Sequence, residues 1–114
     1  MSTIPVILTI AGSDCSGGAG IQADIKTISA LKGYAASVIT AVTAQNTTGV
    51  QAVYPIPPDI VRAQIISVTD DLQPAAIKIG MVHNAAIVHT IAECLQKYRS
   101  RFVVYDPVMV STIV

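Results

Sequence analysis

The segment from Val6 to Leu31 combines three patterns that few folds can accommodate. The run Val6–Ile10 is β-branched and aliphatic, which predicts a strand buried on both faces. A glycine-rich loop follows, from Gly12 to Gly20. Apolar residues then recur at intervals of three and four, which predicts one face of an amphipathic helix: Ile21, Ile25, Ile28 and Leu31. The order strand, glycine loop, helix is typical of the ligand-binding corner of an α/β protein.

The rest of the chain continues to alternate strands with helices. The first helix is expected to end at Lys32 and Gly33, with a cation in its last turn and a glycine in a left-handed cap. Strands at 36–44 and 50–54, joined by turn residues at 46–49, predict a hairpin. Shorter strands are predicted at 76–79 and 102–105.

Two further helices are predicted between these strands. The first begins at Pro57 and stops at Pro74, with a buried face formed by Ile65, Val68 and Leu72. The second has Asn84 as its N-cap and runs through Tyr98, with a buried face formed by Ile87, Val88, Ile91 and Leu95.

This order of elements predicts a mostly parallel sheet with right-handed crossovers. Ligands bind such sheets beyond the carboxyl ends of the strands. Gly12, Gly80 and Asp106 each directly follow a predicted strand. We therefore expect three separate segments to converge at one edge of the sheet.

The composition is unusually apolar for one domain of 114 residues. Hydrophobic residues make up 52% and charged residues only 12%, with a mean hydropathy of +0.59. Typical domains carry about 25% charged residues. Strands buried on both faces, a large oligomer interface, or a missing remainder of the fold would each explain the difference.

Charge and cysteine content narrow the function classes. Seven basic and seven acidic residues give a net charge of zero without a basic cluster, so nucleic-acid binding is not expected. Apolar stretches are far shorter than the roughly 20 residues that span a membrane. Residues 1–5 lack the features of a secretory signal. Cys15 and Cys94 fit neither a metal spacing nor a disulfide framework, which favours a reduced, cytoplasmic protein.

The glycine loop is compatible with several kinds of ligand. The spacing from Gly12 to Gly17 is that of a phosphate-binding P-loop, but the required lysine and hydroxyl residue do not follow it. Residues 18–23 match a dinucleotide-binding pattern, yet no acidic residue lies across Val38–Asn46, about 20 positions later. A plain flexible connection remains a third interpretation.

The longer string Ala11–Asp24, AGSDCSGGAGIQAD, resembles the signature of the hydroxymethylpyrimidine/phosphomethylpyrimidine kinases of thiamine biosynthesis. Further similar blocks occur in order along the chain: Ser37–Ala41, Ala44–Asn46, Gly49–Val50, Lys78–Met81 and Tyr105–Met109. The resemblance implies a ribokinase-like, three-layer α/β/α fold with a mostly parallel sheet. Residues 1–114 would be the N-terminal portion of one such kinase domain, truncated to about half of it.

The resemblance also implies an activity and a set of site residues. In this family, ATP with Mg²⁺ phosphorylates 4-amino-5-hydroxymethyl-2-methylpyrimidine and then its monophosphate. Gln45 would pair with the ring nitrogen and amino group, because its amide both donates and accepts. The other residues carried over are Gly12 and Ala19, through their backbone; Asp24, from the first turn of its helix; Met81 and Val108, against the ring; and Asp106, as a weak metal–phosphate candidate.

Each of these residues also has an ordinary structural interpretation. Asp24 could favour the positive end of its helix, and Met81 could be core packing. Gln45 could be an edge-strand residue, and Asp106 could cap the turn before Pro107. Of the remaining candidates, Cys15 is interpreted as a tolerated substitution in the loop, and His83 and His89 as surface or helix-face residues.

Members of this family are much longer than 114 residues. Their second half supplies the ATP pocket and the groups that activate the attacking hydroxyl, so we expect no catalytic residue in this chain and no activity from it alone. A pyridoxine or pyridoxal kinase of the same superfamily is a second hypothesis. A third is a non-catalytic module that dimerises through the hairpin Ala36–Ile56, as homodimers are typical of the family, or that pairs with a separate C-terminal half.

Overall fold

The computed structural model describes residues 4–106, which form five strands and three helices. In chain order these are β1 (Val6–Asp14), α1 (Gly20–Ala30), β2 (Tyr34–Asn46), β3 (Gly49–Pro55), α2 (Pro58–Leu72), β4 (Ala76–Ile79), α3 (Ala85–Lys97) and β5 (Phe102–Tyr105). Among these residues, no helix is long and apolar enough to cross a membrane.

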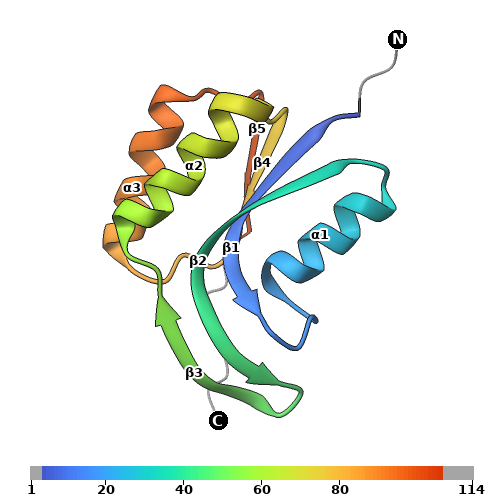
Figure 1. Ribbon diagram of the computed structural model, residues 1–114, viewed down its shortest axis with the longest axis vertical. Coiled ribbons are helices and arrows are strands. Elements are labelled where there is room, and N and C mark those ends of the chain that lie inside the picture. Colours follow the sequence, from blue (N-terminus) through green and yellow to red (C-terminus); the bar gives the residue numbers. More distant parts are fainter. Residues whose placement is uncertain (1–3, 107–114) are drawn as a thin grey trace.

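The strands form one sheet in the order β3-β2-β1-β4-β5. All neighbouring strands run parallel except the β2–β3 hairpin, which is antiparallel. Figure 1 shows α1 on one side of the sheet, and α2 with α3 on the other. The predicted three-layer α/β/α fold with a mostly parallel sheet is therefore confirmed.

The two faces of the sheet carry different residues, because successive strand residues point to opposite sides. Leu8 and Ile10 of β1 are fully buried and belong to a core cluster with residues of α2 and α3. Between them, Thr9 is register partner of Lys78 in β4, and its hydroxyl contacts α1 instead. The apolar cluster also contains Val38, Val61, Ile65, Ile77, Ile79, Ile87, Ile91 and Cys94.

Strand β1 is longer than the sequence indicated. We expected a strand at Val6–Ile10 and a loop from Gly12, but pairing with β2 continues to Asp14 after a register shift between Ala11 and Ser13. The physical reason is that β2 spans 13 residues and offers partners beyond the apolar run. Gly12 therefore lies inside a strand, and the loop begins near Cys15.

The end of α1 also differs from the prediction. The helix ends at Ala30, so Leu31 lies outside its buried face and is 79% exposed. Lys32, and not Gly33, adopts the left-handed conformation, with φ of 69°. Gly33 is constrained for a different reason, because a Cβ there would lie only 2.9 Å from Ile28 Cγ2.

The N-cap of α3 is confirmed, since the Asn84 side chain accepts a hydrogen bond of 3.0 Å from the Ile87 N–H. The predicted burial of Val88 is wrong, because its side chain is 49% exposed. The buried stripe of α3 contains Ile87, Thr90, Ile91 and Cys94, so a threonine and a cysteine occupy positions that the apolar pattern did not identify.

Strand β5 forms one edge of the sheet and is exposed on both faces. The side chains of Phe102, Val103, Val104 and Tyr105 are between 47% and 60% exposed. Within residues 4–106, nothing covers this short apolar edge.

Candidate functional site

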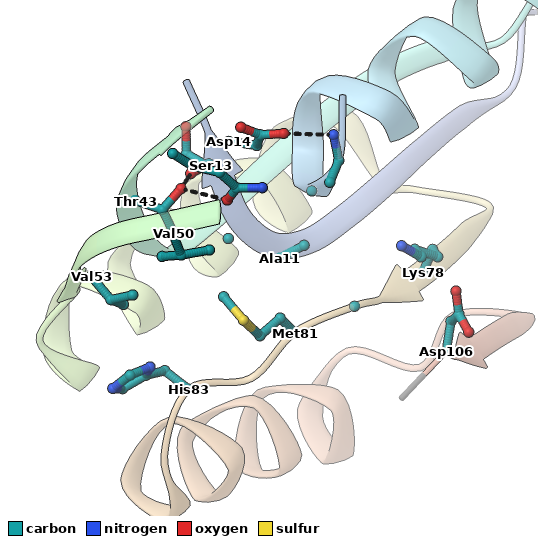
Figure 2. Close-up of a pocket in the computed structure, with 15 residues that line it drawn as sticks. Ala11, Ser13, Asp14, Thr43, Val50, Val53, Lys78, Met81, His83 and Asp106 are labelled. Atoms are coloured by element: carbon teal, nitrogen blue, oxygen red, sulfur yellow. Dashed lines mark hydrogen bonds between the residues drawn. The ribbon is translucent and has the colours of Figure 1, made fainter. Parts of the chain in front are cut away.

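A cavity of about 350 Å³ lies at the carboxyl ends of β1 and β4, beside the β2–β3 hairpin (Figure 2). Gly12, Gly80 and Asp106 all line it, which confirms that the three segments converge at this edge. Of the predicted site residues, Gly12, Ala19, Gln45, Met81 and Asp106 line the cavity. Val108 lies outside the described residues.

Gly12 and Met81 lie directly against each other in the cavity wall. A Cβ on Gly12 would lie 2.8 Å from Met81 Cε, so a larger residue would displace that thioether. Gly20, the first residue of α1, has a φ of 60°, and a Cβ there would overlap the Gly12 carbonyl oxygen. The two glycines thus let α1 begin close against β1 and leave the Met81 side chain as part of the cavity wall.

Gln45 lines the cavity from β2, close to the side chains of Thr43 and Cys15. The Thr43 hydroxyl donates to the Ser13 carbonyl oxygen at 2.7 Å and lies 3.1 Å from Gln45 Oε1. The backbone of Gln45 is held by Cys15, whose Sγ lies 3.1 Å from its oxygen and 3.2 Å from its nitrogen. With its backbone held in this way, Gln45 can present the donor and the acceptor of its side-chain amide to a ligand.

Asp14 organises the glycine loop and is only 3% exposed. Its carboxylate accepts the Ser16 hydroxyl at 2.6 Å and the backbone N–H groups of Ser16, Gly18 and Ala19 at 2.8–3.0 Å. The hydrogen bond from the Ser16 side chain lowers the pKa of Asp14 below its ordinary value, assisted by the backbone donors and opposed by burial. The carboxylate is therefore held ionised at neutral pH.

Asp24 lies elsewhere than its motif implied. It lies beyond the first turn of α1 and does not line the cavity. Its carboxylate accepts a hydrogen bond of 2.6 Å from Thr9 and pairs with the Lys78 ammonium at 3.0 Å. The physical reason is register: Thr9 and Lys78 stand side by side on the face that α1 covers. Lys78, which the sequence did not single out, lines the cavity in its place.

The two ends of the cavity differ in character. Figure 2 shows Lys78 and Asp106 at one end, and His83 and Val53 at the other. Asp106 forms no ion pair with residues 4–106, and no group of three or more potential metal ligands occurs among these residues. His83 is exposed, as predicted for a surface residue, but its place in the cavity wall was missed.

Some of the missed residues left a signal in the sequence. Lys78 is the one charged residue of a short apolar strand, directly before Ile79 and Gly80. Asp14 is the one acidic residue of the loop segment 12–20. Thr43, Val50, Val53 and His83 had no such signal, because their place in the wall depends on how the hairpin packs.

Comparison with known proteins identifies similar chains. The family model described as phosphomethylpyrimidine kinase matches residues 14–113. A hydroxymethylpyrimidine/phosphomethylpyrimidine kinase from Escherichia coli is 58% identical over 104 residues, which is 91% of this chain and 39% of that protein. The chain thus spans less than half the length of this relative.

Solved structures agree with this similarity. A phosphomethylpyrimidine kinase from Clostridium difficile has a TM-score of 0.91 and 55% identity, covering 95% of this chain and 47% of that one. A pyridoxal kinase from Staphylococcus aureus, solved in complex with AMP-PCP and pyridoxal, has a TM-score of 0.84 and 35% identity, covering 94% and 40%. The predicted ribokinase-like fold matches these kinase structures.

Proposed function

Because this chain belongs to the phosphomethylpyrimidine kinase family, we propose that its cavity binds the pyrimidine substrate of a hydroxymethylpyrimidine/phosphomethylpyrimidine kinase. The reaction would be ATP-dependent phosphorylation of 4-amino-5-hydroxymethyl-2-methylpyrimidine and of its monophosphate. The observation that carries this proposal is the cavity itself, which brings Gly12, Ala19, Gln45 and Met81 together from three separate segments. Its volume of about 350 Å³ is in the range of small-molecule sites.

The residues of the wall have distinct roles in this proposal. The Gln45 amide pairs with the ring nitrogen and the amino group, and its Oε1 lies 3.1 Å from the Thr43 hydroxyl. Met81 packs against one ring face, next to the backbone of Gly12. Asp24 acts indirectly, because its carboxylate holds the Lys78 ammonium at the cavity and does not itself line it. Val108 remains a predicted contact with the other face of the ring.

ATP and Mg²⁺ would serve as phosphate donor and metal. The glycine loop does not fit the phosphates of ATP, because Asp14 already accepts its N–H groups. Asp106 fits as one Mg²⁺ ligand, since this ion commonly takes one or two carboxylates together with substrate phosphates. The bound metal would neutralise charge on those phosphates.

Calorimetric titration with the pyrimidine and with pyridoxal tests the proposed substrate. We expect Gln45→Ala to weaken pyrimidine binding about tenfold, the effect of losing one or two net hydrogen bonds. Gln51→Ala is the matched control, because Gln51 is an exposed glutamine of β3 outside the cavity wall. Equal losses in both variants would contradict the assignment of Gln45.

A pyridoxal kinase is the second candidate, favoured by the similarity to the Staphylococcus aureus structure. Pyridoxal also carries a hydroxymethyl group on an aromatic nitrogen ring, so the same wall could bind it. Tighter binding of pyridoxal than of the pyrimidine in the titration above would favour this candidate.

The chain alone is expected not to turn over ATP. Less than half of the length of the Escherichia coli relative is covered, and none of the residues that we assign activates the attacking hydroxyl. An ATP-consumption assay of the 114-residue chain with the pyrimidine tests this, and turnover above background would contradict it. A cytoplasmic location belongs to the same proposal, supported by the free thiols of Cys15 and Cys94.

Association is a further part of the proposal. The β2–β3 hairpin exposes Val42, Val53 and Tyr54, which suits a homodimer interface, and the uncovered β5 edge suits a complementing C-terminal half. A monomer in sedimentation equilibrium would exclude the homodimer.

A further inference from the structure

The donors of the glycine loop converge on a side chain of the loop itself. Backbone N–H groups of Ser16, Gly18 and Ala19 point at the Asp14 carboxylate, at 2.9, 3.0 and 2.8 Å. The Ser16 hydroxyl adds a fourth donor at 2.6 Å. Several N–H groups that converge on one anion form the kind of concave site that binds phosphate in other proteins. Here a carboxylate of the chain occupies it.

The loop is closed around this carboxylate from both sides. The Gly17 N–H donates to the Asp14 carbonyl oxygen, and the Lys26 ammonium donates to the Gly17 carbonyl oxygen. The Gln22 side chain accepts from the Asp14 N–H at 2.8 Å. Asp14 is only 3% exposed, so its carboxylate is a structural part of the folded loop and is not available to bind a ligand.

We propose that Asp14 is a positioning residue that determines specificity. Its carboxylate occupies the N–H and O–H donors that would otherwise bind a phosphate. The loop therefore forms a cavity wall that accepts an uncharged part of the ligand. Ser13, Asp14, Ala19 and Gly20 then line the cavity in a fixed arrangement. An anionic ligand group must bind elsewhere, and the Lys78 ammonium is the cation in the wall. This holds whichever aromatic ring the cavity takes, so it does not depend on the proposed substrate.

The replacement Asp14→Ala tests the proposal, because it leaves three N–H groups without their acceptor. Inorganic phosphate is added to the ¹⁵N-labelled chain at constant ionic strength, and the amide signals of Gly18 and Ala19 are followed by NMR. We expect saturable shifts of these signals in the variant, and only small shifts that do not saturate in the original chain.

The control variant Asp70→Ala removes the same charge from an exposed position of α2, away from the loop. It should respond to phosphate as the original chain does. An identical response of the Asp14→Ala and Asp70→Ala variants would overturn the proposal, and so would saturable phosphate binding to the loop of the original chain.

A measurement on the original chain covers the case in which Asp14→Ala fails to fold. The amide shifts of Ser16, Gly18 and Ala19 are followed during acid titration. We expect one common midpoint, because a single carboxylate accepts all three. Charged or titratable groups near the loop are Cys15 within it, Lys26 on α1, Lys78 with its partner Asp24, and His83 and Asp106 in the same cavity wall. Separate midpoints, or no shifts, would overturn the proposal.

Discussion

The two faces of the sheet are both covered by helices, but they are held by different interactions. Under α2 and α3, aliphatic side chains such as Leu8 and Ile10 form one continuous core. Under α1, the contacts include the Thr9 hydroxyl, the Asp24 carboxylate and the Lys78 ammonium. Lys78 of the second face also lines the cavity. The contrast indicates that one face supplies most of the stability and that the other positions the binding groups.

The contrast arises within single strands. In β1, Leu8 and Ile10 point to one side and Thr9 to the other, so one strand serves both purposes. Apolar burial is non-directional and roughly proportional to area, at about 25 cal/mol per Å². Hydrogen bonds require particular partners, and a buried group that loses its partner is destabilising. Substitutions on the α1 face should therefore change stability according to the chemical identity of each side chain. Substitutions on the other face should change it mainly according to side-chain size.

The largest effect is expected in the apolar core. Replacing Leu8 by alanine removes a fully buried side chain and should lower the free energy of unfolding by about 3 kcal/mol. Val103→Ala in β5 is the control, because that side chain is 47% exposed and should change stability by less than about 0.5 kcal/mol. Urea unfolding measures both. Similar losses would mean that the β5 edge is covered in solution.

The sequence predicted the apolar face well, because burial there follows simple periodicity. Ile87 and Ile91 are buried as expected, and every predicted strand and helix is present. The errors in predicted burial occur where a residue fits the apolar spacing of the helix but the packing of neighbouring elements does not cover it. Val88 fits an apolar stripe, yet Thr90 and Cys94 complete the buried face, since both are small enough to pack there.

The polar face was less predictable, because hydrogen-bond networks have no period. A motif identified Gly12, Gln45 and Met81, and these line the cavity. It gave Asp24 a direct role, whereas the register of β1 against β4 pairs that carboxylate with Lys78, and Lys78 lines the cavity. Such a contact joins residues 54 positions apart, so local sequence patterns do not reveal it.

A smaller effect is expected from the ion pair under α1. Lys78→Met leaves the Asp24 carboxylate, whose side chain is 18% exposed, without its cation. We expect a loss of about 1–2 kcal/mol in the free energy of unfolding, less than for a fully buried pair because water reaches both groups. Chemical denaturation of Lys78→Met, Asp24→Asn and the double variant measures the coupling.

The matched control for this pair is Arg62→Met. Arg62 pairs with Glu93 at 3.2 Å, but these side chains are 34% and 56% exposed. That replacement should cost less than about 0.5 kcal/mol. If Arg62→Met were the more destabilising of the two, the special importance of the α1 face would be contradicted.

The smallest effect concerns acid and distinguishes the glycine loop from the apolar core by titration. The pKa of Asp14 is lowered from 3.8, so its ionised form stabilises the folded state. This contribution is complete above the unfolded-state pKa and disappears as the pH falls through the lower pKa of the folded state. It should be modest, because a neutral carboxyl group still accepts hydrogen bonds, about half as strong as before. Urea unfolding at a series of acidic pH values measures the difference between the original chain and Asp14→Asn.

That difference should shrink toward low pH, since the asparagine side chain does not titrate and the other carboxyl groups are common to both chains. The Leu8→Ala difference should stay constant over the same range, because the core cluster around Leu8 contains no carboxyl group. The pH dependences of these two differences thus test whether the glycine loop and the apolar core contribute to stability separately. A Leu8→Ala difference that followed pH as closely as the Asp14 difference would show that the glycine loop and the apolar core are coupled and do not act separately.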